Sequence, residues 1–76
     1  MITVKFYGLM RVESGIKELQ VEAVNLKALY ARLQEAGLKL QDLKGCCVLV
    51  NGVPAGRKPV FQDGDVVQML PPVAGG

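Results

Sequence analysis

The residues of this chain that could do chemistry lie at its end, where Gly75 and Gly76 place a free α-carboxylate behind two residues without a Cβ. Glycine lets backbone atoms pass through a constriction, or lie against another protein's backbone, at distances that other residues do not permit. Pro71 and Pro72 fix their own φ and keep the residue before each of them extended. The pattern predicts a stiff segment that carries the carboxylate of Gly76 into a partner's active site.

We therefore divide the chain into a folded domain, residues 1–70, and a C-terminal tail, residues 71–76. The tail consists of Pro71, Pro72, Val73, Ala74, Gly75 and Gly76. At about 3.3 Å per extended residue it reaches roughly 20 Å, which is about the depth of an enzyme pocket. The alternative is a frayed terminus rich in small residues. The two prolines and the hydrophobic strand before them favour the functional interpretation.

Length and composition exclude several classes of protein. A chain of 76 residues forms one small domain with little room for an internal catalytic cleft. Half of the residues are apolar, which is enough for one modest core. The nine basic and seven acidic residues are scattered along the chain without a run of like charge. This distribution argues against nucleic-acid binding, which usually requires a basic patch.

The two cysteines, Cys46 and Cys47, are adjacent, so a disulfide between them would distort a strand. We expect both to be reduced, which fits a cytoplasmic protein. We also expect both to be small buried hydrophobes on an apolar strand rather than reactive thiols. The chain has no secretory signal pattern and no apolar run near the ~20 residues that span a bilayer.

The sequence offers few groups for acid, base or metal chemistry. It contains no histidine, which removes the commonest general base and zinc ligand. Asp63 and Asp65 flank Gly64, and this spacing is more typical of a turn that enters a strand than of paired catalytic carboxylates. We therefore expect no metal site and no catalytic group of the protein's own.

Hydrophobic periodicity predicts the order strand, strand, helix, strand, short irregular element, strand. The strands are expected at residues 2–7, 16–23, 46–50 and 65–70, with the first two joined as a hairpin through a short connection. The helix, residues 26–36, should begin after Asn25 as N-cap and end before Gly37. Its apolar stripe is best explained as a cover for the sheet. Residues 38–44 have room for one helical turn, and Asn51-Gly52 is the strongest hairpin turn signal.

One long helix on one face of a sheet leaves the other face without a helix. The candidates to line that open face are Tyr7, Cys46 or Cys47, Val48 and Leu70. Exposed apolar area of this kind usually marks a partner surface. The twist of the sheet and its loops could equally cover much of it.

Three segments resemble a known family, the ubiquitin-like β-grasp sulfur carriers, and most closely the small subunits of molybdopterin synthase and the thiamin sulfur carriers. They are the first strand with its following arginine (residues 2–11), Val48-Leu49-Val50-Asn51-Gly52, and Asp63-Gly64-Asp65 with the strand that runs into the tail. The resemblance implies an α+β fold of the ubiquitin-like β-grasp type. In that fold a mixed sheet of four to five strands carries one main helix on one face.

The resemblance also implies a sequence of chemical steps. An E1-like adenylating enzyme uses ATP to activate Gly76, and a sulfur donor persulfide protein then supplies the sulfur that displaces AMP and leaves a thiocarboxylate. The acceptor implied is the large subunit of molybdopterin synthase, or alternatively thiazole synthase. No cofactor is expected on the chain itself. Tyr7, Arg11 and Leu70 are the expected partner-binding residues, with Arg11 in the loop after the first strand and facing a carboxylate in the partner or within the domain.

Other readings of the tail stay open at this point. The carrier could serve thiamin synthesis, tRNA thiolation or cysteine synthesis instead. Gly76 could also be joined to a lysine amine of another protein, or the chain could be an interaction module with an inert tail. The two prolines and Arg11 favour the molybdopterin version within the carrier class.

Overall fold

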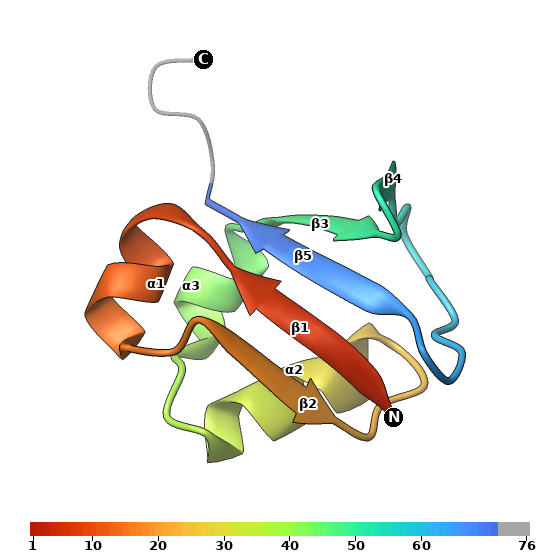
Figure 1. The fold of residues 1–76 in the computed structure, drawn as a ribbon, viewed down its shortest axis with the longest axis horizontal. Coiled ribbons are helices and arrows are strands. Elements are labelled where there is room, and N and C mark those ends of the chain that lie inside the picture. The colour runs from red at the N-terminus through yellow and green to blue at the C-terminus, as the bar shows by residue number, and fades with distance from the viewer. Residues whose placement is uncertain (72–76) are drawn as a thin grey trace.

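A five-stranded mixed sheet in the order β2-β1-β5-β3-β4 forms the framework of the protein (Figure 1). The computed structural model describes residues 1–71. The elements are β1 (Ile2–Phe6), α1 (Gly8–Ser14), β2 (Glu18–Val21), α2 (Leu26–Glu35), α3 (Leu40–Lys44), β3 (Cys47–Val50), β4 (Val53–Pro54) and β5 (Val66–Leu70). β1 and β5 pair in parallel at the centre, and the remaining pairs are antiparallel. The predicted α+β class, with one main helix on a mixed sheet, is confirmed.

The core lies between the sheet and its helices. The alternation predicted for the first strand is confirmed, since Ile2, Val4 and Phe6 are at most 2% exposed. The parallel register places Phe6 beside Met69, which is also fully buried. Alternate residues of β1 and β5 therefore face the helices and their neighbours face the other way.

The main helix α2 is bounded by the residues that the sequence predicts. The side chain of Asn25 accepts a hydrogen bond from the Ala28 N–H at 2.9 Å, which is the expected N-cap. At the other end Gly37 takes a φ of +105°, and the Leu38 N–H donates to the Leu33 carbonyl at 3.0 Å. This αL termination is available to glycine at no steric cost.

Helix α1 is the main departure from the predicted elements. The sequence predicts an irregular connection between the first two strands, and the structure places seven helical residues there. Met10 anchors this helix with 9% exposure, whereas Val12 is 76% exposed. A helix of seven residues gives a weak periodic signal, because it has only about two turns and its stability comes from tertiary packing. Arg11 consequently lies on a helix and not in a loop.

The other boundaries differ from the expectations by a few residues. The strand expected at residues 16–23 is shorter and covers only β2. The strand expected at residues 46–50 is β3, which begins at Cys47 and not at Cys46. The helical turn predicted within residues 38–44 is confirmed as α3. Part of the stretch expected to be irregular pairs with β3 as β4.

The predicted Asn51-Gly52 hairpin turn is confirmed. Asn51 has a φ of +52° and Gly52 a φ of +84°, as a tight turn between β3 and β4 requires. Asn51 also ties this turn to the start of β5. Its Oδ1 accepts from the Val66 N–H at 3.0 Å, and its Nδ2 donates to an Asp65 carboxylate oxygen at 3.0 Å.

Asp63 and Asp65 serve the turn that enters β5, as their spacing predicts. The other carboxylate oxygen of Asp65 accepts from the Gln62 N–H at 2.8 Å. Asp63 contacts the Met1 ammonium group, whose hydrogen bond lowers the pKa of that carboxyl group. Across residues 1–71 no group of three His, Cys, Asp or Glu side chains is arranged to hold a metal ion. Nor is any helix in that part of the chain long and apolar enough to cross a membrane.

Two leucines of α3 provide a matched test of the core. Leu43 is fully buried, and Leu40 on the same helix is 38% exposed. We expect Leu43→Ala to lower the free energy of unfolding by about 2–4 kcal/mol, because it leaves a cavity. Leu40→Ala should lower it by less than about 1 kcal/mol. Urea denaturation of both variants measures the difference, and equal losses would contradict the core described above.

Candidate functional site

The described residues reach the predicted functional segment only at Pro71. The expected positions Pro72, Val73, Ala74, Gly75 and Gly76 lie outside the described residues. What the structure defines is the place where β5 ends. We call the residues gathered there, Tyr7, Gly8, Cys47, Leu70 and Pro71, the tail base.

Strand register brings the tail base together from three parts of the sequence. β1 and β5 pair in parallel as far as Phe6 and Met69, so the next residues along each strand are Tyr7 and Leu70. β3 runs antiparallel to β5 and places Cys47 opposite Leu70. Tyr7, Leu70 and Cys47 therefore form one row across the end of the sheet.

This row belongs to the face of the sheet that points away from α2, which we call the open face. Over β1, β3 and β5 it is lined by Thr3, Lys5, Tyr7, Cys47, Leu49, Val66, Gln68 and Leu70. Cys47 is exposed and the other members are half-buried. Gln68 donates a hydrogen bond from Nε2 to the Tyr7 hydroxyl at 3.1 Å, which ties the end of β1 to β5. The part of the open face over β3 and β5 is thus mainly apolar, and it is continuous with the point where Pro71 follows β5.

Two of the residues expected on the open face lie on the other side. Val48 pairs with Met69, which places it toward the helices, where it packs against the core. Cys46 also packs against the core. The predicted positions of Tyr7, Leu70 and Cys47 are confirmed. Leu49 is not predicted because residues 46–50 are apolar throughout, and such a run has no alternation that distinguishes the two faces. Val66 and Gln68 are also not predicted, although a period of two counted back from Leu70 would have placed them on the same face.

Arg11 is exposed in the last turn of α1, the helix that begins at Gly8 of the tail base. Its backbone carbonyl accepts a hydrogen bond from the Gly15 N–H at 3.0 Å. Its guanidinium makes no ion pair with another residue in the range 1–71. The expectation that Arg11 meets a carboxylate is therefore not met within this range, and binding to a partner carboxylate stays a prediction.

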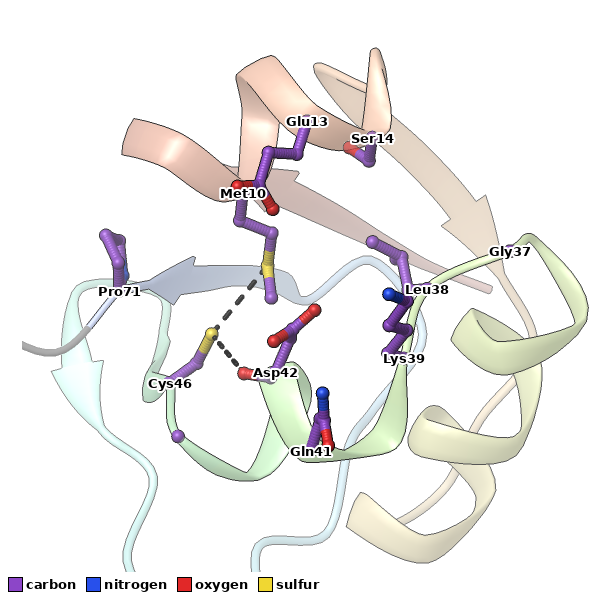
Figure 2. Close-up of a pocket in the computed structure, with 11 residues that line it drawn as sticks. Met10, Glu13, Ser14, Gly37, Leu38, Lys39, Gln41, Asp42, Cys46 and Pro71 are labelled. Carbon is purple, nitrogen blue, oxygen red and sulfur yellow. Dashed lines mark hydrogen bonds between the residues drawn. The ribbon is translucent and has the colours of Figure 1, made fainter.

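A hollow of about 410 Å³ lies beside the tail base, between α1 and α3 (Figure 2). It is lined by Met10, Glu13, Ser14, Gly37, Leu38, Lys39, Gln41, Asp42, Gly45, Cys46 and Pro71. The charged side chains around it, from Glu13, Lys39 and Asp42, are all exposed. No ion pair joins these three side chains in the described part of the chain.

Cys46 lies in this hollow, in surroundings that disfavour the reactive thiolate form. Its thiol donates to the Asp42 carbonyl at 3.2 Å, and the Met10 sulfur is 3.7 Å from its Sγ (Figure 2). Burial, and then the negative charges of Asp42 and Cys47, raise the pKa of the Cys46 thiol. Cys46 thus resembles the small buried hydrophobe that the sequence predicts. That prediction is wrong for Cys47, which is exposed on the open face.

The two thiols should differ in reactivity. Because the thiolate is the nucleophile, the raised pKa and half-burial of Cys46 should slow its alkylation. We expect iodoacetamide to modify Cys47 at least about tenfold faster in the native protein. Mass spectrometry of peptides from a timed reaction measures both rates. The difference should largely disappear in urea, and equal native rates would contradict the environment described for Cys46.

The arrangement of this sheet and its main helix is that of a ubiquitin-like β-grasp protein. Solved structures with the same fold include SAMP1 from Haloferax volcanii, with a TM-score of 0.82 and 21% identity over 99% of this chain and 98% of that one. A chain of the complex of subunits 1 and 2 of molybdopterin-converting factor from Helicobacter pylori gives 0.75 and 32% identity, over 99% and 97%. Urm1 from Trypanosoma brucei gives 0.71 and 30% identity, over 99% and 94%.

The model of the ThiS family matches residues 4–76, and the chain belongs to this family of ubiquitin-like sulfur carriers. A comparison with curated protein sequences gave no significant match. The family resemblance carried by the N-terminal strand, the Asn51-Gly52 turn and the C-terminal segment is thereby confirmed. The Helicobacter pylori protein was solved together with a second subunit, so at least one similar carrier works within a protein complex.

Proposed function

We propose that this protein is the sulfur-carrying subunit of a sulfurtransferase that forms molybdopterin, with Gly76 as the site that carries the sulfur. The observation that carries this proposal is the 32% identity, over 99% of the chain, to a component of the molybdopterin-converting factor complex. The family match supports the carrier chemistry, and this similarity supports the choice of acceptor.

The chemistry requires a carboxylate to become an acyl donor. A carboxylate resists attack because of its negative charge and lacks a leaving group. A partner enzyme of the E1-like adenylating class would use ATP to form an acyl-adenylate at Gly76, with release of pyrophosphate. The terminal sulfur of a protein persulfide would then displace AMP to give an acyl persulfide. A second thiol of a partner would cleave its S–S bond, which releases the thiocarboxylate and leaves a disulfide on the partner. The thiocarboxylate sulfur is ionised and nucleophilic near neutral pH, where an ordinary thiol is largely protonated.

The folded domain contributes docking and not catalysis in this proposal. The open face presents half-buried apolar side chains next to Pro71, so a subunit bound over Tyr7 and Leu70 would lie where the tail begins. Arg11, which pairs with no carboxylate in residues 1–71, is placed to bind one on the partner. The acid, base and ATP site would all belong to the partners.

Intact-mass measurement of the protein purified from its own cells tests the carrier chemistry. We expect a fraction of the protein to be heavier by the difference between one sulfur and one oxygen atom. Covalent adducts with other proteins would instead support conjugation through Gly76. A single unmodified mass, even after incubation with an adenylating enzyme, ATP and a persulfide donor, would overturn the proposal.

Reconstitution with two alternative acceptors tests the pathway. The thiocarboxylate form is incubated with either the large subunit of molybdopterin synthase or thiazole synthase, each with its own precursor. We expect sulfur to appear in the pterin product and not in the thiazole. Transfer to thiazole synthase alone would replace the molybdopterin assignment with one in thiamin synthesis.

A further inference from the structure

We propose that Gly8 is a positioning residue that seats the ring of Pro71 and so sets the direction in which the diglycine segment is delivered to a partner. This inference rests on the proposed function, because it concerns how Gly76 reaches an active site. Its basis is a close approach at the tail base. A Cβ built on Gly8 would lie 2.8 Å from Cγ of Pro71 and 3.5 Å from its Cδ.

That distance is closer than ordinary van der Waals contact, so only glycine fits against the proline ring in this arrangement. The backbone adds a second requirement, since Gly8 has a φ of +64°, in the left-handed region. Gly15, at the other end of α1, has a similar φ of +73°, but a Cβ there would meet nothing within 4 Å. Gly8 and Gly15 therefore share the conformational requirement and differ in the contact with Pro71.

The two sides of this contact are held in place by the sheet. β1 and β5 pair in parallel up to Phe6 and Met69, which are 1% and 0% exposed. The hydrogen bond between Gln68 and the Tyr7 hydroxyl spans the same two strands at the open face. Pro71 has no N–H with which to extend the ladder. Its ring lies instead against Gly8, at the position where the next pair of residues would stand.

The contact matters because a small change in the direction of the chain at Pro71 would displace the end of a long segment by a larger distance. For an extended segment of roughly 20 Å, a tilt of about 15° at Pro71 displaces the last residue by roughly 5 Å. An acyl transfer needs its reacting atoms placed within about an ångström, since a misplacement of that size can cost on the order of a hundredfold in rate. A fixed position of the Pro71 ring against Gly8 reduces the number of orientations of the following segment from which a partner must select.

The test compares Gly8→Ala with Gly15→Ala in adenylation by the partner enzyme, followed as pyrophosphate release from ATP. Both variants suffer the unfavourable φ, so both should lose thermal stability. Only Gly8→Ala should also lower kcat for adenylation, by about tenfold or more, while Gly15→Ala stays within about twofold of the unchanged protein. Equal kcat values in two folded variants would overturn the inference.

Pro71→Ala provides the complementary change, because it removes Cγ and Cδ of the ring that a Cβ at Gly8 would strike. In a double-mutant cycle, Gly8→Ala with Pro71→Ala should be less damaging to unfolding midpoint and to kcat than the sum of the single changes. Gly15→Ala with Pro71→Ala should be additive. Additivity in both cycles would show that Gly8 and Pro71 are not coupled and would overturn the inference.

These readouts separate the inference from the proposed function. If the unchanged protein is not adenylated at all, the proposed function fails, and the positioning role of Gly8 fails with it. The double-mutant cycle measured by unfolding midpoint still shows whether Gly8 and Pro71 are in contact. If the unchanged protein is adenylated and the Gly8 cycle is additive, the proposed function stands and the inference alone is wrong. Should Gly8→Ala fail to fold, Pro71→Ala by itself must lower kcat without lowering the unfolding midpoint. An unchanged kcat in that variant would overturn the positioning role.

Discussion

Deletion of Gly76 is expected to abolish uptake and transfer of sulfur while leaving the thermal unfolding midpoint unchanged. The expected loss is complete because the carboxylate of Gly76 is the acyl group that the partner would activate. The fold should be unaffected, since the core that residues 1–71 form extends from Ile2 to Met69 without a contribution from Leu70 or Pro71. Intact mass after incubation with the adenylating enzyme, ATP and a persulfide donor measures sulfur uptake, and circular dichroism on heating measures stability.

Replacement of Gly76 by a bulkier residue should give the same result for a different reason, since its Cβ would obstruct close passage of the backbone in the partner's site. Gly52→Ala is a control away from the tail. It disturbs only the hairpin turn, in which Gly52 has a φ of +84°. That variant should lose stability and keep its sulfur uptake. A marked fall in stability on deleting Gly76, or continued thiocarboxylate formation without it, would contradict the separation of domain from tail.

Leu70→Asp is expected to weaken binding to the larger subunit by about tenfold to a hundredfold. Leu70 stands on the open face opposite Cys47 and directly before Pro71, so a partner that receives the tail would cover it. A carboxylate at that position would have to be desolvated on binding without a charge to pair with. Loss of one central apolar contact in an interface commonly costs about 1–3 kcal/mol, which corresponds to the expected change in Kd.

Val60→Asp is the matched control for this measurement. Val60 is 75% exposed and directly precedes Phe61, whose N–H donates to the Val24 carbonyl in the connection before α2. The Val60→Asp substitution introduces the same charge away from the open face, so the affinity for the larger subunit should change by less than about twofold. Titration calorimetry of both variants against the isolated large subunit gives the two dissociation constants. Equal affinities would show that the open face is not the docking surface.

In the proposed function, the open face and the tail base together would let so small a domain take part in group transfer. The central pair of strands, β1 and β5, ends where Tyr7 and Leu70 stand, and the residues that we propose for docking surround the point at which Pro71 follows. A partner that recognises this surface would receive the following residues at the same time. In the proposed function, the parallel register of β1 and β5 would thus place the recognition surface beside the start of the delivered segment.

Several features of the fold could be read from local sequence. Asn25 and Gly37 bound the main helix because one caps its first N–H groups and the other accepts a left-handed conformation. Asn51-Gly52 specifies its hairpin for the same conformational reason. The buried side of β1 follows from strict alternation over five residues. Each of these signals depends on residues that are close together in the chain.

The sequence by itself therefore determined the main helix on the sheet, most of the strands and the family, because capping, turns and alternation are local and the C-terminal motif is contiguous. It did not determine helix α1 or strand β4. Only the tertiary structure decided which side of the sheet Val48 and Cys47 occupy, since an all-apolar strand takes its orientation from its pairing with β5. It likewise decided that Gly8 lies against Pro71. That contact joins residues far apart in the chain through the parallel register of β1 and β5, and no local pattern encodes such a register.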